Sequence, residues 1–279
     1  MLTITELYIY PVKSLGGIRV NSALLTDRGF EHDRRWMVIN TENRFITQRE
    51  FPAMALLQVQ VTETGLHIQH KTKPDESIDI PFQPPLPSTV PVTVWDDMCE
   101  AQYVNDQVDE WLSDMLSANC RLVYMPDSSR RRVDTRYAAN NEITNLSDGY
   151  PVLMIGEASL ADVNRRMAIP LPMNRFRPNI VFSGGSPFEE DTMAHFTIRG
   201  MDFYAVKPCA RCVITTINQD NALAAKEPLK TLAAYRNKNN KIYFGQNILY
   251  RGSGLVQVGD RIEVMERKPA MEFSSNFAL

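Results

Sequence analysis

The chain of 279 residues is long enough for one large domain or two of ordinary size, each with a buried core. With 44% hydrophobic and 23% charged residues, its composition is that of a globular protein and not of a disordered one. The net charge of −3 gives no general attraction to nucleic acid or membranes, and no apolar run has the length or flanks of a membrane span or signal peptide. We therefore expect a soluble cytoplasmic protein that binds anions only through local clusters of cations.

Most of the chain is predicted to form short strands. Segments rich in β-branched and aromatic residues predict strands at 4–10, 35–40, 44–48 and 213–217. Residues 56–70 alternate apolar and polar side chains around Thr64-Gly65, which predicts a hairpin, and 90–104 predict a second one. Two further strands are expected in 255–266, joined at Gly259-Asp260.

Three helices are predicted. Apolar residues repeat at helical spacing in 105–118, where Asn105 can cap the first turn, and again in 156–167 and 227–236. The proline-rich stretch 81–91 is expected to be a surface loop, and a domain boundary is expected near 125–130. The predicted fold class is α+β, dominated by antiparallel strands and containing a barrel.

The segment "KPCARCVITT" (207–216) holds two of the four cysteines, Cys209 and Cys212. One C-x-x-C gives only half of a structural zinc site, and no histidine pair lies nearby in sequence. A redox dithiol usually lies where a strand turns into a helix, whereas a strand is expected to follow here. Two buried structural thiols, or a single thiolate presented to a ligand, also remain possible.

Several turns combine a cation with a small or capping residue, and together they indicate an anion site. Such a site suits a small phosphorylated cofactor, as in sites for pyridoxal phosphate, because arginine binds phosphate in a bidentate manner. The sequence has neither a P-loop nor G-x-G-x-x-G. Lys207 and Arg211 favour a thiolate at Cys212, and a thiolate is a soft metal ligand. The cationic turns hold Lys13 and Ser14, Arg34 and Arg35, Arg130, Arg131, Arg132 and Arg136, and Arg175, Arg177 and Asn179.

Eight segments in this order resemble MOSC-domain proteins with their N-terminal β-barrel partner domain, in particular the amidoxime-reducing molybdenum enzymes, and more distantly the molybdenum cofactor sulfurases. They are "YPVKSLGG", "DRRWMVIN", "SDGYPVLMIGEASL", "NRFRPNIVFSG", "VKPCARCVITTIN", "KEPLKTLAAYR", "FGQNILY" and "VGDRIEV". The resemblance implies an antiparallel β-barrel MOSC domain at 126–267, a smaller α+β N-terminal domain at 1–125 and a tail at 268–279. Residues 1–34 are expected to pack into the cofactor site.

The resemblance also implies a molybdenum–molybdopterin cofactor, with Cys212 as catalytic residue and metal ligand and Cys209 as a structural thiol. The implied reaction is the reduction of N-hydroxylated compounds (amidoximes, hydroxylamines and N-hydroxylated bases). The four cysteines of a fused ferredoxin domain and a membrane anchor are not found, so the electrons are expected to come from a separate redox protein. Two alternatives stay open, a persulfide carrier and a non-catalytic molybdopterin carrier. The implied cofactor-binding residues are Lys13, Ser14, Arg34, Asp148, Gly149, Arg177, Asn179 and Arg211.

Overall fold

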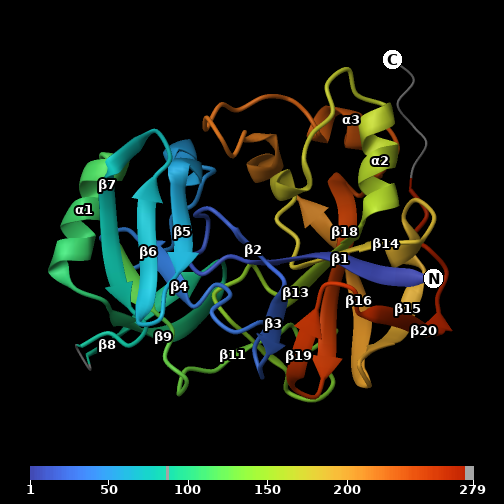
Figure 1. Ribbon diagram of the computed structural model, residues 1–279, viewed down its shortest axis with the longest axis horizontal. Coiled ribbons are helices and arrows are strands. Elements are labelled where there is room, and N and C mark those ends of the chain that lie inside the picture. Colours follow the sequence, from blue (N-terminus) through green and yellow to red (C-terminus); the bar gives the residue numbers. More distant parts are fainter. Residues whose placement is uncertain (86–87, 274–279) are drawn as a thin grey trace.

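Seven strands close into a barrel in one half of the molecule (Figure 1). The order around the barrel is β13, β14, β1, β20, β15, β16 and β18, and β18 pairs again with β13. All of these pairs are antiparallel except β13–β14. The strand-dominated α+β fold with a barrel is thus confirmed, with one parallel pair. The strands are β1 Leu2–Ile9, β13 Val152–Gly156, β14 Ile180–Ser183, β15 Met193–Ile198, β16 Met201–Arg211, β18 Lys241–Arg251 and β20 Arg261–Arg267.

This computed structural model describes residues 1–85 and 88–273. The predicted loop 81–91 and tail 268–279 therefore each lie partly outside the described residues. Within the described ranges, no helix is both long and apolar enough to cross a lipid bilayer.

The barrel is filled by inward-facing apolar side chains, which leave almost no solvent-exposed surface. β1 contributes Ile4 and Leu7, β14 contributes Phe182, and β15 and β16 contribute Phe196 and Phe203. The alternation of buried and partly exposed residues along β1 reflects the period-2 geometry of a strand with one face in the core. Burial of these side chains is the main force that holds the barrel closed.

Shorter elements surround the barrel. α2 and α3 cover one end of it and share a hydrophobic cluster around Phe176 and Phe244 (Figure 1). The strand pairs are β2 Ile18–Val20 with β1, β3 Ser22–Leu25 with β19 Gly254–Gln257, β11 Arg131–Arg132 with β12 Ile143–Thr144, and β17 Asn237–Lys238 with β18. The helices are α2 Glu157–Arg165 and α3 Leu229–Ala233, with 3-10 turns η2 Met173–Arg175, η3 Glu189–Asp191 and η4 Val213–Thr216.

The other half contains two antiparallel sheets and one long helix around a separate core that includes Trp36, Leu112 and Leu122. Both predicted hairpins are present. Asn105 caps the helix as predicted, because its Oδ1 accepts a 2.8 Å hydrogen bond from the Val108 N–H. The elements are β4 Trp36–Ile39, β10 Arg121–Tyr124, β9 Asp97–Tyr103 and β8 Thr89–Val94 in one sheet, β5 Leu57–Val61, β6 Gly65–His70 and β7 Lys73–Pro81 in the other, α1 Asp106–Leu116, and η1 Pro52–Leu56.

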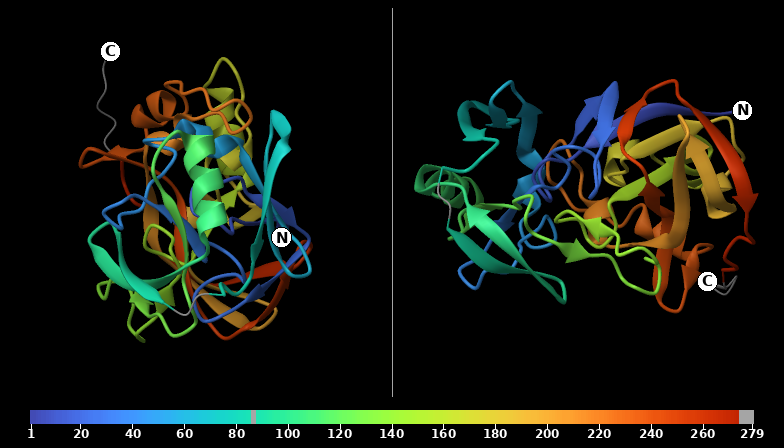
Figure 2. Two further views of the ribbon diagram at one scale, coloured as in Figure 1. Left: turned by 90° about the vertical axis from the view of Figure 1, so that its left-hand side faces the viewer. Right: turned by 90° about the horizontal axis from the view of Figure 1, so that it is seen from below.

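The chain starts in the barrel half, crosses to the other half at β4 and returns after β10. Seen from below, the two halves lie side by side and the N-terminal segment runs into the barrel half (Figure 2). Among the described strands, β1, β2 and β3 pair only with those of the barrel half. The division of the chain near residue 125 into two domains stays a prediction.

Two predicted strands are wrong. Residues 213–217 form the 3-10 turn η4, because the hydroxyls of Thr215 and Thr216 donate to the carbonyls of Cys212 and Val213, at 3.0 and 2.7 Å. Residues 44–48 make only isolated bridges to β4 and β8 before a turn in which the Glu50 N–H donates to the Thr47 carbonyl. Local side-chain hydrogen bonds and tertiary contacts outweigh the β-propensity of both segments.

Candidate functional site

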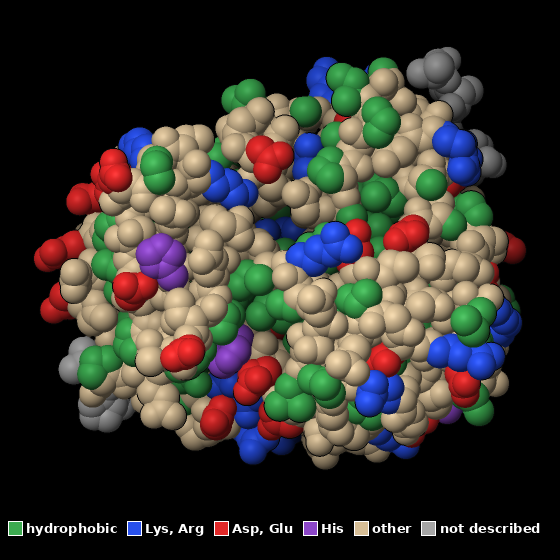
Figure 3. Space-filling view, in the orientation of Figure 1, with side chains coloured by type: hydrophobic (Ala, Val, Ile, Leu, Met, Phe, Trp, Pro, Cys, Tyr) green, Lys and Arg blue, Asp and Glu red, His purple; other side chains and the backbone are tan. Residues whose placement is uncertain are grey.

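A cavity of about 270 Å³ lies beside the end of β16. It is lined mainly by loops of the barrel half, together with Thr47 from the other half. The space-filling view shows a recess between the two halves, with Lys and Arg side chains in and beside it (Figure 3). All nine residues predicted for the site line this cavity, although their roles stay predictions. They are Lys13, Ser14, Arg34, Asp148, Gly149, Arg177, Asn179, Arg211 and Cys212.

The C-x-x-C segment presents its two thiols to different arginines. β16 ends at Arg211, so Cys212 lies at the junction between the strand and η4. Arg211 Nη1 lies 3.1 Å from Cys209 Sγ, and Arg49 Nη1 lies 3.6 Å from Cys212 Sγ. Within residues 1–85 and 88–273, no group of three or more His, Cys, Asp or Glu side chains could hold a metal ion. A metal bound by Cys212 would therefore take its other ligands from a cofactor.

Lys13 and Asp148 form an ion pair at the cavity. The ammonium nitrogen lies 2.6 Å from Asp148 Oδ1, which also accepts a 3.2 Å hydrogen bond from Trp95 Nε1. Burial lowers the pKa of Lys13 to about 8, even though Asp148 favours its charged form. Desolvation alone would raise the pKa of Asp148, but its side chain is 61% exposed, and the charges of Lys13 and Arg49 lower that pKa.

The carboxylate of Asp33 organises the floor of the site. It is fully buried and accepts hydrogen bonds from the Tyr10 N–H at 2.9 Å, from Arg34 Nη1 at 2.7 Å, and from the side-chain amides of Asn179 and Asn145 at 3.1 and 3.2 Å. These donors satisfy a buried charge that would otherwise be very costly. Asp33 therefore fixes the positions of Arg34 and Asn179, two of the predicted binding residues.

Two guanidinium groups lie over the ring of Tyr10. The Arg34 and Arg177 side chains are 4.4 and 4.3 Å from its centroid, and the Tyr10 hydroxyl donates to the Pro178 carbonyl. Arg34 is paired with Asp33, whereas Arg177 has no carboxylate partner among the described residues. Burial lowers the pKa of Arg177 to about 10. A partly buried cation without a carboxylate partner indicates that this part of the cavity suits an anionic ligand.

The cavity has polar wall atoms that lack hydrogen-bond partners, and it has open space beside Gly149. Within the described part of the chain, Arg211 Nε and Tyr150 Oη are buried and lack hydrogen-bond partners. Both residues line the cavity. A Cβ added at Gly149 would meet no atom within 4 Å. Unsatisfied buried donors beside open space indicate a site for a polar ligand, so these residues fit a phosphorylated cofactor that brings its own metal ligands.

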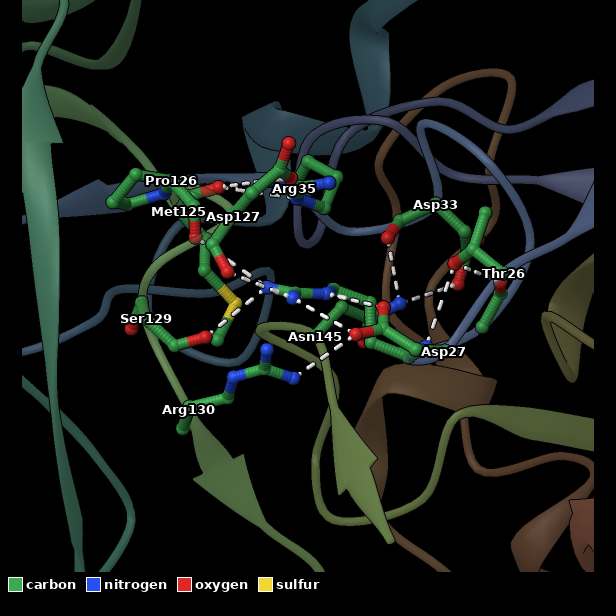
Figure 4. Close-up of polar contacts among 12 residues, drawn as sticks. Thr26, Asp27, Asp33, Arg35, Met125, Pro126, Asp127, Ser129, Arg130 and Asn145 are labelled. Atoms are coloured by element: carbon green, nitrogen blue, oxygen red, sulfur yellow. Dashed lines mark hydrogen bonds and ion pairs between the residues drawn. The ribbon is translucent and has the colours of Figure 1, made fainter.

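Most of the other predicted cations are used elsewhere, which corrects the broader anion cluster expected from sequence. Arg35 donates to the Met125 carbonyl and pairs with Asp127, and Arg130 pairs with Asp27 (Figure 4). The remaining four arginines do not line the cavity. Arg136 pairs with Asp134, and Arg131 pairs with Asp97. Arg175 donates to the Thr215 carbonyl, and Arg132 lies in β11. Cation-rich sequence alone did not separate ligand-facing arginines from structural ones.

Sequence reasoning missed Asp33, Asn145, Tyr10, Trp95 and Arg49. Asp33 directly precedes Arg34, and Asn145 begins the polar turn that contains Asp148, so both lay within segments already singled out. Trp95 and Arg49 come from the other half of the molecule, and no local pattern links them to Cys212.

Known proteins match both parts of the chain. A family model described as the MOSC N-terminal beta barrel domain matches residues 1–119, and one described as the MOSC domain matches residues 141–263. The mitochondrial amidoxime-reducing component 1 of Mus musculus is 30% identical over 94% of this chain and 82% of its own length. The molybdenum cofactor sulfurase of Oryza sativa subsp. japonica is 31% identical over 86% of this chain and 31% of its own length. The solved structure of the YuaD protein from Bacillus subtilis aligns over 94% of this chain and 95% of its own, with 11% identity and a TM-score of 0.43.

Proposed function

The chain belongs to the MOSC-domain family, and we propose that it is a molybdenum-cofactor-dependent oxidoreductase that reduces N-hydroxylated compounds. The names of its relatives support this proposal, since one is an amidoxime-reducing component and another a molybdenum cofactor sulfurase. The observation that carries the proposal is the convergence of nine residues from distant parts of the sequence on one cavity with a thiol at its edge.

Each of these residues has a proposed task. Cys212 would bind the metal through its thiolate, and Arg177, Arg211 and Lys13 would bind the anionic groups of the pterin and its phosphate. Gly149 would leave room for the cofactor and offer its backbone N–H. Asp33 would hold Arg34 and Asn179 in place. Cys209, which contacts Arg211, would be a structural thiol.

When bound, the molybdenum cofactor would supply the two-electron chemistry, in which RC(NH₂)=NOH, two electrons and two protons give RC(NH₂)=NH and water. The protein would fix the cofactor and keep the thiolate facing the substrate.

The electrons would come from a separate redox protein. Cys99 and Cys120 are buried in two different hydrophobic clusters, far in sequence from Cys209 and Cys212. The four cysteines of the sequence therefore do not converge on a site for an iron–sulfur cluster in the described structure.

The test is to purify the protein from a host that makes the cofactor, measure its molybdenum by elemental analysis, and assay benzamidoxime reduction with reduced viologen. We expect about one molybdenum per chain and formation of benzamidine. Molybdenum without any reduction would instead favour a molybdopterin carrier. Protein without molybdenum from a competent host would contradict the proposal.

The similarity to a molybdenum cofactor sulfurase favours one second candidate, a persulfide carrier at Cys212. In that case cyanide would release sulfur as thiocyanate from the purified protein, and the Cys212→Ala variant would release none. A protein that holds molybdenum and releases no thiocyanate would rule this candidate out.

A further inference from the structure

Arg49 approaches Cys212 from outside the cavity. Its Nη1 lies 3.6 Å from Cys212 Sγ, yet Arg49 is not among the residues that line the cavity, whereas Cys212 is. A cofactor that fills the cavity would leave Arg49 beside the thiol, on the side outside that space. That side is where a substrate has to arrive, because the cavity itself is then occupied.

Two aromatic rings of the other half hold Arg49 in this position. Its guanidinium carbon lies 4.4 Å from the Trp95 ring centroid and 5.7 Å from that of Phe45. The Trp95 indole is fixed in turn by its hydrogen bond to Asp148. Arg131 anchors the same hairpin turn, because it pairs with Asp97 at 2.7 Å and donates to the Ser147 carbonyl.

The hairpin backbone also fixes the position of Trp95. Its φ of 59° is in the left-handed region, which a bulky aromatic residue rarely adopts. Trp95 is the first residue of the two-residue turn between β8 and β9, so the hairpin itself holds this conformation. Despite the anchoring, the Trp95 side chain remains 44% exposed, so it presents apolar surface beside Arg49.

Most N–H groups of the Arg49 guanidinium have no protein acceptor among the described residues. A guanidinium carries five N–H donors, and within residues 1–85 and 88–273 the only acceptor of the Arg49 side chain is Cys212 Sγ. No carboxylate of the described chain lies within ion-pair distance of it, since Asp148, whose pKa Arg49 lowers from farther away, is paired with Lys13. An arginine that lies over an aromatic ring and keeps most of its N–H donors unpaired is suited to bidentate binding of a carboxylate.

We propose that Arg49, Trp95 and Phe45 form a substrate subsite that selects planar N-hydroxylated compounds bearing a carboxylate. The inference rests on the proposed reductase function, and it names the substrate class. The guanidinium binds the carboxylate, and the exposed indole contacts the planar part of the substrate. The half of the molecule that contains β4–β10 thereby sets specificity at a thiol that belongs to the barrel half.

The first arm of the test compares substrates of one shape and different charge. Molybdenum-loaded wild type, Arg49→Gln and Arg44→Gln are assayed with benzamidoxime and 4-carboxybenzamidoxime. Arg44 is the matched control, because it is exposed, lies in the same segment and carries the same charge. The quantity compared is the kcat/KM for 4-carboxybenzamidoxime divided by the kcat/KM for benzamidoxime. We expect this ratio to exceed one in wild type and to fall about tenfold in Arg49→Gln, whose molybdenum content stays unchanged. Arg44→Gln should keep the wild-type ratio.

The second arm needs no activity and uses the cofactor-free protein. Iodide, an anionic quencher, and neutral acrylamide are titrated against tryptophan fluorescence, with Trp95→Phe to identify the Trp95 signal. Trp36 is only 1% exposed, so it contributes little quenching. We expect Arg49→Gln to reduce quenching by iodide and not by acrylamide, whereas Arg44→Gln changes neither.

An equal kcat/KM ratio in wild type and Arg49→Gln, or an equal fall in both variants, would overturn the proposal. Loss of molybdenum in Arg49→Gln would also overturn it, because Arg49 would then hold the cofactor. If wild type reduces neither compound, the proposed function has failed. Iodide quenching then decides the subsite alone: a selective fall in Arg49→Gln supports it, and no change overturns it.

Discussion

Lys13 and Asp148 form an asymmetric ion pair, in which the lysine side chain is 6% exposed and the aspartate side chain 61% exposed. The protein has thus buried the cation and left its counter-ion at the surface. Arg131 and Arg34 also face Lys13 and disfavour its charged form, in addition to the effect of burial. An anion bound in the cavity would supply the missing negative charge.

Sulfate binding by the cofactor-free protein should weaken about fivefold between pH 8 and pH 9, because with a Lys13 pKa of about 8 the protonated fraction falls from about one half to about one tenth over this range. Sulfate keeps its own charge over this range. Titration calorimetry measures the affinity, and Lys13→Met should show weak binding with little pH dependence. A wild-type affinity that stays constant from pH 7 to 9 would contradict the role of Lys13.

The contribution of Lys13 to folding stability should rise with pH, whereas its contribution to sulfate affinity falls. The pKa of Lys13 is lower in the folded state than in an unfolded chain, where it is about 10.4. Between pH 8 and that value the unfolded chain binds more protons, so the contribution of Lys13 to the free energy of unfolding rises with pH. Urea unfolding of wild type and Lys13→Met at pH 7.5 and 9.5 measures this contribution, and a smaller wild-type advantage at the higher pH would show that the sign is wrong.

Cys212→Ala should abolish molybdenum binding and change the free energy of unfolding by about 1 kcal/mol or less, because the thiol is only partly buried. Cys209→Ala should keep most of the metal, since its thiol contacts Arg211 instead. Elemental analysis and thermal denaturation of both variants check this. Equal metal loss in the two proteins would point to a site that uses both cysteines.

Asp33→Asn should destabilise the protein by about 3–5 kcal/mol, because Arg34 would lose its buried partner. The matched control is Asp127→Asn, which breaks the pair of Arg35 with an exposed carboxylate and should cost about 1 kcal/mol or less. Chemical denaturation of the two cofactor-free variants gives the comparison. If both lose the same stability, the Asp33 network is no more important for folding than a surface pair.

Gly149→Leu should lower molybdenum content without changing the melting temperature of the cofactor-free protein. Gly149 does not have a positive φ, and a Cβ there meets no protein atom, so the substitution introduces neither strain nor a clash. Gly149→Ala is the size control and should keep the metal. Full molybdenum in the leucine variant would show that this position does not face the cofactor.

Local patterns predicted the parts of the fold that local interactions decide. The hairpin around Thr64-Gly65 and the helix capped by Asn105 depend on residues within a few positions of each other, so one sequence window contains the whole cause. The 3-10 turn after Cys212 was missed because Thr215 and Thr216 use their hydroxyls to bond back to the chain, which β-propensity does not describe.

The candidate site likewise contains some residues that local sequence patterns predict and others that they do not. Lys13, Arg177 and Cys212 stand in recognisable segments, and they do line one cavity. By contrast, Asp33 acts through Asn145 and Asn179, more than a hundred residues away, and Arg49 reaches Cys212 across 163 positions. A single sequence holds no periodicity that links such distant residues, so only their positions in space reveal them.

The place of β1 in the barrel sets an order of assembly during synthesis. β1 lies between β14 and β20, so the first strand to leave the ribosome waits for one of the last before the barrel can close. Within the described residues, the strands from β4 to β10 form sheets only with one another and can form earlier. Until Arg261–Arg267 has emerged, no closed barrel holds Lys13 and Cys212 at one cavity, so a nascent chain lacks the proposed cofactor site.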